Sequence, residues 1–204
     1  MNLLLSSDGK TAIQNISKVC SKKNPKVAWI ITASKTKENS NFLNRDLQEF
    51  IKQGITPHIY DINNKTVDDF SKDFVDFDLI YMEGGNSFYL LKSIRESGFD
   101  KFLEEWIVSK PYIGVSAGTY VTCPTIDMAT WKHADRDRHG LEDLTGLNFI
   151  DFMITVHYDE KYKNVIKKGS ENLEYPLRII KDGQALLIQD NKVTLLGDKE
   201  EIKI

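Results

Sequence analysis

The residues best suited to chemistry form the run Gly114-Val115-Ser116-Ala117-Gly118, which follows the apolar residues 111–113. A G-x-S-x-G run after a short hydrophobic strand is typical of a nucleophile elbow, a strained turn on which a serine hydroxyl projects clear of a sheet. A helix that follows would aim its free N–H groups at the site of a developing oxyanion. Ser116 is therefore the candidate nucleophile. The alternative is a glycine-rich strand-to-helix turn, which is common in parallel-sheet proteins.

A serine hydroxyl needs a base within hydrogen-bond reach, and the chain has four histidines. His157 ends the strand-like run 149–156 and is the predicted base, with a structural histidine as the alternative. His58 lies inside an apolar strand pattern, which favours a packed core or edge residue. His133 and His139 lie in a charged loop and are expected to be solvated.

The third member of such a triad is a carboxylate that accepts a hydrogen bond from the imidazole. Asp127 lies just beyond the elbow helix in the run Pro-Thr-Ile-Asp-Met and is the first candidate. Asp135, Asp137 and Glu142 compete from the adjoining loop. Each of these carboxylates could instead be a solvated surface group.

The turn Gly84-Gly85-Asn86 follows another predicted strand and is the candidate oxyanion site. Glycine lets the backbone approach a substrate closely, so the N–H of Gly85 could act together with that of Ala117 as a two-donor oxyanion hole. The alternative is a phosphate-binding glycine turn. The chain contains neither G-x-G-x-x-G nor G-x-x-x-x-G-K-[ST], which disfavours that alternative.

Short β-rich runs alternate with helical patterns along the chain, which predicts an α/β fold with a mostly parallel central sheet between two layers of helices. The predicted strands are 2–6, 26–32, 56–62, 78–82 and 111–113, and the predicted helices are 11–21, 39–53, 66–74, 87–97 and 100–109. Functional groups in such sheets gather outside the carboxyl ends of the strands. We therefore expect Ser116, Gly85 and His157 at one edge.

Beyond the elbow the pattern is looser. Residues 130–145 are polar and charged and predict a surface loop, whereas residues 158–169 predict a helix. The runs 184–189 and 192–196 flank Asp190-Asn191, which predicts a tight hairpin. With 204 residues and no linker or repeat, we expect a single domain over residues 1–204.

The composition excludes several function classes. With 41% hydrophobic and 28% charged residues and a net charge of −3, the chain is typical of a globular protein and has no basic field for nucleic acid. No apolar run approaches the ~20 residues of a membrane span, and no secretory signal is evident. The two cysteines lack metal-ligand spacing. We expect a cytoplasmic protein without nucleic-acid or membrane partners, and no feature calls for a metal or cofactor.

Three motifs, taken together, carry a family resemblance: residues 83–91, 112–118 and 124–128. They are similar to the G-G-N-x-F-x-L-L, G-x-S-A-G and P-T-I…Asp-Met motifs of the dipeptidase E (aspartyl dipeptidase) and cyanophycinase family of serine peptidases. The resemblance runs from the first strand to about residue 160, with the motifs in the same order and at similar spacing.

The resemblance implies a flavodoxin-like fold related to the class I glutamine amidotransferases, with serine in place of their elbow cysteine. It also implies a Ser-His-Asp or Ser-His-Glu triad, and exopeptidase activity on a small peptide substrate by a monomer or homodimer. Ser116, His157 and Gly85 match the family's nucleophile, base and oxyanion positions. Asp127 matches the Asp-Met pair but follows Pro-Thr-Ile directly, so the intervening loop is shorter than in dipeptidase E.

Substrate preference does not follow from the resemblance. Downstream of the histidine, dipeptidase E has a G-E-T-R-E-type segment, whereas this chain has residues 159–165, Asp-Glu-Lys-Tyr-Lys-Asn-Val. We therefore do not expect a preference for N-terminal aspartate. Two other functions stay open: hydrolysis of another amide or an ester by the same elbow, and a non-catalytic binding domain. The α/β-hydrolases share the elbow but place the acid late in the chain and the histidine last.

Overall fold

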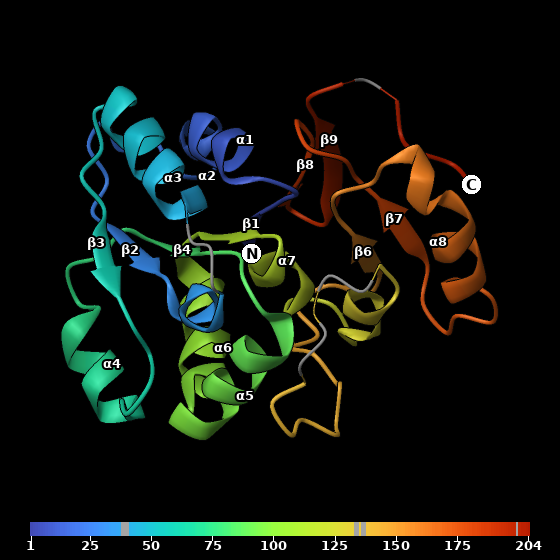
Figure 1. Cartoon of the computed structure of the whole chain (residues 1–204). Helices are drawn as coiled ribbons and strands as arrows, with labels where there is room; N and C mark the ends of the chain where they lie inside the picture. Colours follow the sequence, from blue (N-terminus) through green and yellow to red (C-terminus); the bar gives the residue numbers. More distant parts are fainter. Residues whose placement is uncertain (38–40, 133–134, 136–137, 199) are drawn as a thin grey trace.

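The central feature of the fold is a β-sheet with helices on both faces (Figure 1). The structure is a computed structural model that describes residues 1–37, 41–132, 135, 138–198 and 200–204. Within these ranges the central sheet has seven strands in the order β3-β2-β4-β5-β1-β8-β9. They are β1 (Asn2–Ser6), β2 (Val27–Ile30), β3 (His58–Tyr60), β4 (Leu79–Met82), β5 (Tyr112–Val115), β8 (Ala185–Gln189) and β9 (Lys192–Leu196).

Strands β3, β2, β4, β5 and β1 are parallel, and the connections between them are mostly helical. The helices are α1 (Gly9–Gln14), α2 (Ile16–Val19), α3 (Asn41–Lys52), α4 (Val67–Asp73), α5 (Ser87–Ser97), α6 (Phe99–Ser109), α7 (Ala117–Tyr120) and α8 (Lys163–Gly169). Short 3-10 turns are η1 (Thr32–Thr36), η2 (Asp127–Thr130) and η3 (Glu160–Tyr162). This arrangement confirms the predicted α/β class with a mostly parallel sheet.

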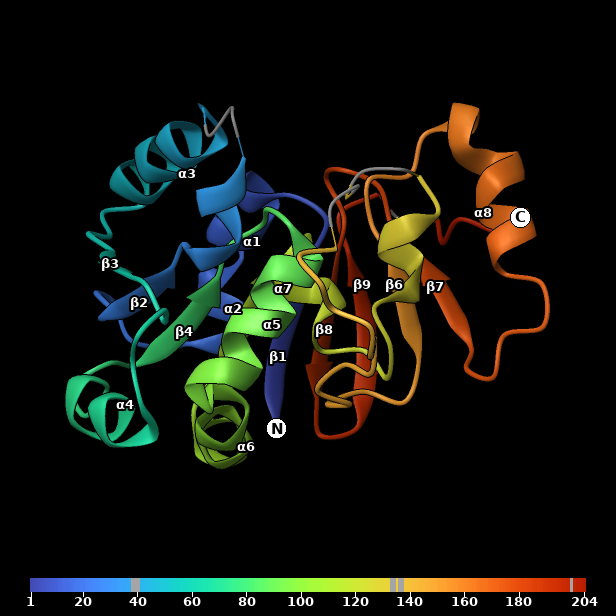
Figure 2. The ribbon, with the colours of Figure 1, turned by 60° about the horizontal axis from the view of Figure 1, so that its bottom comes forward.

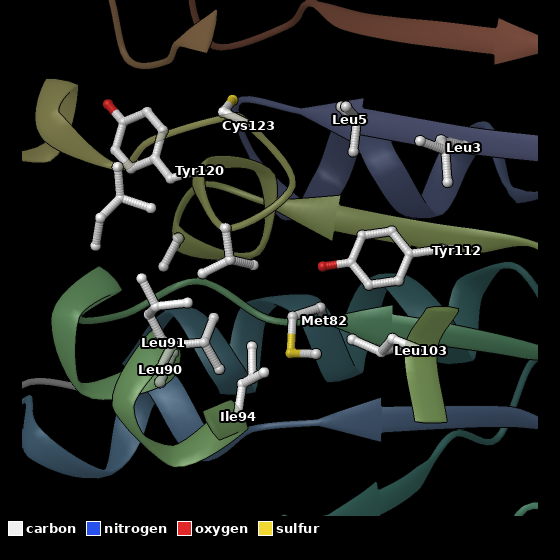
Figure 3. Close-up of a cluster of buried hydrophobic side chains, with 14 of the residues drawn as sticks. Leu3, Leu5, Met82, Leu90, Leu91, Ile94, Leu103, Tyr112, Tyr120 and Cys123 are labelled. Carbon is white, nitrogen blue, oxygen red and sulfur yellow. The ribbon is translucent and has the colours of Figure 1, made fainter. Parts of the chain in front are cut away.

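The two faces of the sheet bury different sets of side chains, because neighbouring residues of a strand point to opposite faces. Leu4 of β1 packs with α1, α2 and α3, whereas Leu3 and Leu5 pack with the cluster that includes α5 and α6. The helices of these two layers lie on opposite sides of the sheet in Figures 1 and 2. Figure 3 shows the second cluster, in which Met82 and Tyr112 meet side chains of α5 and α6.

The helix boundaries follow local signals. Asn86 caps α5 by accepting a hydrogen bond from the N–H of Tyr89 at 2.9 Å, and Gly98 ends the same helix with a φ of 74°. The predicted helix 11–21 is instead two short helices with Asn15 between them, since the Asn15 side chain donates to the carbonyl of Thr11. No helix of the described residues is long and apolar enough to cross a membrane.

The last two strands of the central sheet reverse its direction. β8 lies antiparallel to β1, with Ser6 opposite Ala185, and β9 lies antiparallel to β8. Asp190 and Asn191 join β8 to β9 with φ values of 49° and 61°, the two positive values of a tight hairpin turn. The start of β8 therefore lies at the same edge as the ends of the parallel strands.

A separate sheet lies beside the central one (Figure 1). It consists of β6 (Met153–Thr155) and β7 (Leu177–Ile179), which pair in parallel. The strand before His157 therefore lies outside the central sheet. The β6 residues Met153 and Ile154 are buried in the same hydrophobic cluster as side chains of α5 and α6, and this packing brings the end of β6 close to the edge at which the parallel strands end.

Candidate active site

Ser116 lies at the end of β5 on a strained turn. Its backbone has φ 50° and ψ −104°, a conformation that costs a residue with a side chain of the order of 1–3 kcal/mol. Steric contacts explain the glycines on either side of it. A Cβ at Gly114 would lie 2.4 Å from the carbonyl oxygen of Gly118, and a Cβ at Gly118 would lie 2.2 Å from the carbonyl oxygen of Met82. Ser116 therefore lies on a strained turn between β5 and α7.

His157 lies directly opposite this serine. Its Nε2 is 3.0 Å from Ser116 Oγ, and its backbone, two residues beyond β6, has a positive φ of 53°. The imidazole remains 45% exposed, so it is open to solvent and to a ligand. This distance is that of a hydrogen bond from the hydroxyl to a neutral imidazole.

The carboxylate beside His157 is Asp182, not Asp127. Asp182 Oδ1 lies 2.6 Å from His157 Nδ1, the position in which we expected Asp127. Asp127 lies exposed in η2, where its backbone N–H donates to Thr125 Oγ1 and its carbonyl accepts from Thr130 Oγ1. The hydrogen bond from His157 lowers the pKa of Asp182, so this carboxylate is ionised at neutral pH.

Of the competing loop carboxylates, Asp135 and Glu142 do not take this position either. Asp135 is buried and accepts a hydrogen bond from the N–H of Ser87 at 2.7 Å, and it pairs with Lys37 at 2.8 Å. Glu142 is exposed. Asp137 lies outside the described residues.

Asp182 differs from the expected carboxylates because it precedes a strand and lies far along the chain from the elbow. It lies in the Asp182-Gly183 turn before β8, and β8 runs antiparallel, so its amino end meets the same edge. An Asp-Gly turn directly before the hairpin strand was the available signal.

Ser7 is hydrogen-bonded to both Asp182 and His157. It is fully buried at the end of β1, donates a hydrogen bond to Asp182 Oδ1 at 2.7 Å and accepts one from the His157 N–H at 2.9 Å. One hydroxyl thus holds both the carboxylate and the backbone of the imidazole residue. Sequence analysis did not identify Ser7.

The turn from Glu83 to Asn86 packs against the serine. A Cβ at Gly84 would lie 3.1 Å from Ser116 Cβ, and Gly85 has a φ of 151° with its Cα against the Ala33 carbonyl, so only glycine fits there. The N–H groups of Glu83, Gly84 and Asn86 donate to Ile30 O, Glu83 Oε1 and Ala33 O. No acceptor for the N–H of Gly85 or of Ala117 is found among the described residues.

The remaining histidines lie away from this constellation. His58 is exposed on the edge strand β3, with its ring 5.3 Å from that of Phe77. His139 packs against the ring of Tyr89 at 5.1 Å. His133 lies outside the described residues.

Comparison with known proteins assigns the family, since residues 3–196 match peptidase family S51. The chain belongs to peptidase family S51. It is therefore a serine-type peptidase, and the family resemblance stated from the motifs is confirmed.

Several relatives of this S51 chain cover most of its length. An uncharacterized peptidase of Pasteurella multocida is 28% identical over 86% of both chains. The crystal structure of a protein from Listeria monocytogenes assigned to peptidase E covers 97% of this chain and 98% of its own, with 26% identity and a TM-score of 0.83. Peptidase E of Shewanella amazonensis is 30% identical over 61% of this chain and 56% of its own length.

A cavity of about 810 Å³ opens at the constellation of this S51 peptidase. Ser116, His157, Asp182 and Gly85 line it, and its wall carries charges of both signs. Its further acidic side chains are Asp8, Asp46, Glu49, Glu83 and Asp135, and its basic side chains are Lys10, Lys37, Arg45, Lys52 and Lys132. Within the described ranges no group of three or more His, Cys, Asp or Glu side chains could hold a metal ion.

Two buried carboxyl groups lie under the glycine turn. Glu83 accepts hydrogen bonds from Trp29 Nε1 at 2.7 Å and from the Gly84 N–H, and its side chain is hydrogen-bonded to that of Asp46. Burial raises the pKa of both Asp46 and Glu83, and their proximity adds to the shift of Glu83. The pair therefore keeps a shared proton at pH values where separate carboxyl groups are ionised.

This pair predicts that stability falls as pH rises. The folded state holds a proton that the unfolded chain releases above pH ~4, so the free energy of unfolding decreases as pH rises through the raised pKa values, by about 1.4 kcal/mol per pKa unit. Asp46→Asn can donate to Glu83 without that proton. Urea unfolding at pH 5.5 and 8 is expected to show a smaller decrease for Asp46→Asn than for the wild type. Equal decreases would mean that the pair holds no extra proton.

Proposed function

We propose that this S51 peptidase hydrolyses short peptides as an exopeptidase, with Ser116 as nucleophile, His157 as general base and Asp182 as the carboxylate of the triad. The observation that carries the proposal is the unbroken line from Ser116 Oγ through His157 Nε2 and Nδ1 to Asp182 Oδ1, at 3.0 and 2.6 Å. These are the contacts that activation of a serine hydroxyl requires.

In the first half of the reaction His157 Nε2 takes the proton of Ser116 as Oγ attacks the peptide carbonyl carbon. Asp182 accepts the Nδ1–H, which keeps Nε2 free as the acceptor and stabilises the imidazolium that forms. His157 then gives its proton to the leaving amine as the C–N bond breaks. A water molecule, deprotonated by the same imidazole, releases the acyl group from Ser116.

The oxyanion would be held by the N–H groups of Gly85 and Ala117. Three N–H groups of the glycine turn are already used by protein acceptors, which leaves that of Gly85 for a ligand. A Cβ at Gly84 would lie 3.1 Å from Ser116 Cβ, and this close approach of the glycine turn to the serine supports Gly85 as the donor. Two preformed backbone donors at a tetrahedral intermediate lower the barrier without reorganisation in the reaction.

The cavity favours short peptides as substrates. Its volume of about 810 Å³ falls in the range of small-molecule sites. Charges of both signs on its wall match the ammonium and carboxylate groups that lie close together only in a very short peptide.

The test is a library of dipeptides and tripeptides with each N-terminal residue, in free and terminally blocked forms, with products identified by mass spectrometry. Cleavage of free short peptides, and none by Ser116→Ala, is the expected result. Turnover of esters or other amides without any peptide cleavage would overturn the exopeptidase assignment.

The position of Ser7 adds a prediction for the same assay. Ser7→Ala removes a hydrogen bond to an ionised carboxylate, which should lower kcat/KM on the order of 10- to 100-fold. Because Ser7 acts through Asp182, the same change should add little once Asp182→Asn is present. Ser170→Ala, a hydroxyl bonded only to a local carbonyl on α8, is the matched control. Full additivity of Ser7→Ala and Asp182→Asn would contradict a positioning role through Asp182.

A further inference from the structure

Lys132 is a buried cation in the wall of the catalytic cavity. It follows η2, is only 9% exposed and lines the same cavity as Ser116 and His157. Lysine is almost never buried to this degree unless its charge is paired. The burial of the charged Lys132 side chain therefore needs an explanation.

The ammonium group of Lys132 has three hydrogens and, among the described residues, one acceptor, the carbonyl oxygen of Val156. In the part of the chain that the structure describes, no carboxylate oxygen lies within ion-pair distance, 4.0 Å, of its Nζ. Asp182 and Asp135 interact with the ammonium group electrostatically at longer range, which raises the pKa of Lys132. Burial has the larger effect and lowers this pKa to about 8. A buried ammonium without a counterion is costly, and an anion that enters the cavity would recover that cost.

The position of this charge indicates which part of a substrate it would meet. Val156 directly precedes His157, so Lys132 Nζ lies on the imidazole side of the cavity. In the proposed mechanism the imidazole gives its proton to the leaving amine, so the leaving residue is the part of the peptide nearest this side.

We propose that Lys132 binds a carboxylate of the peptide substrate, supplied by the α-carboxylate of the leaving residue or by an acidic side chain on it. This inference rests on the proposed function. Lys132 would then determine specificity, because it favours peptides whose C-terminus lies close to the scissile bond. Lys132 is then a binding group with one hydrogen on the protein and the others available to the ligand.

The experiment compares kcat/KM for the best library peptide as the free acid and as its C-terminal amide, in the wild type and in Lys132→Gln. Glutamine can still donate to a carbonyl but carries no charge. We expect the wild type to prefer the free acid on the order of 10-fold or more, the effect of a charged hydrogen bond. In Lys132→Gln this ratio should fall close to 1. Lys168→Met, an exposed lysine of α8, should keep the wild-type ratio.

A third peptide separates the two carboxylate sources. The C-terminal amide with aspartate as the leaving residue should regain the lost rate in the wild type if an acidic side chain is the ligand. It should remain slow if the α-carboxylate is the ligand. In both cases the dependence on Lys132 must be seen. If Lys132→Gln and Lys132→Met slow all peptides by the same factor, the lysine only supports Val156 and the proposal is wrong.

A binding measurement separates this proposal from the peptidase mechanism. Calorimetric titration of dialanine and of its C-terminal amide into Ser116→Ala needs no turnover, and tighter binding of the free acid is expected. That difference should vanish in Ser116→Ala/Lys132→Gln. Equal binding of both ligands to Ser116→Ala, with no gain in affinity for an amide that has aspartate as the leaving residue, would overturn the carboxylate site. Absence of any Ser116-dependent hydrolysis, by contrast, would refute the mechanism and leave the calorimetric result standing.

Discussion

Replacing Ser116 with alanine is expected to abolish peptide hydrolysis, with kcat lowered by at least about 10⁴-fold. The hydroxyl faces His157 Nε2 across 3.0 Å, and a methyl group in its place leaves nothing for the imidazole to deprotonate. The fold should persist, because Ser116 is only half-buried and belongs to neither hydrophobic cluster. Product analysis with a cleaved dipeptide, beside a thermal unfolding curve, measures both effects.

Two companion measurements strengthen this test. Ser116→Gly should be equally inactive but more stable than Ser116→Ala by about 1 kcal/mol, because glycine adopts the φ of 50° without steric cost. A fluorophosphonate probe should label Ser116 in the wild type. Full activity of Ser116→Ala, or labelling at another residue, would reject Ser116 as the nucleophile.

Replacing Asp182 with asparagine is expected to lower kcat by as much as about 10⁴-fold. The amide can present a donor to His157 Nδ1, which would favour the tautomer that carries its proton on Nε2 and cannot accept from Ser116. KM should change little, because Asp182 contacts His157 and Ser7. Steady-state kinetics on the best library peptide measures the split between kcat and KM.

Asp127→Asn is the matched control for Asp182→Asn. Both changes remove one carboxylate charge. Asp127 is exposed and lies in η2, so Asp127→Asn should hardly change kcat. If Asp127→Asn proved as damaging and Asp182→Asn harmless, the triad would have to be reassigned to the carboxylate expected from the motifs.

Much of the site could be predicted because it depends on local sequence. The elbow needs small residues at Gly114 and Gly118, and the glycine turn needs a conformation open only to glycine at Gly85, so both are visible as short motifs. The placement of His157 followed from an apolar run that ends at it. Its role, like those of Ser116, Gly85 and Ala117, stays a prediction until the kinetics are measured.

The contribution of Asp182 and Ser7 could not be predicted in the same way. Both depend on the pairing of β1 with β8, whose antiparallel direction is not encoded in the hydrophobic pattern of either strand. Likewise the alternation of strands and helices predicted the central sheet, but the three-residue strand β7 has too few residues for a period. Its pairing with β6 in a second sheet is a property of the packed molecule.

The pairing of β1 with β8 also has a consequence for the time at which activity arises. During translation the chain presents Ser116 first, then His157, and Asp182 only shortly before β8. β1 is synthesised long before β8, so its pairing with β8 forms only after residue 189 is made, and such distant pairings form slowly. Under the proposed mechanism we therefore expect a nascent chain to carry nucleophile and base without the carboxylate that orients them. The ribosome-bound peptidase would stay inactive until its C-terminal hairpin docks.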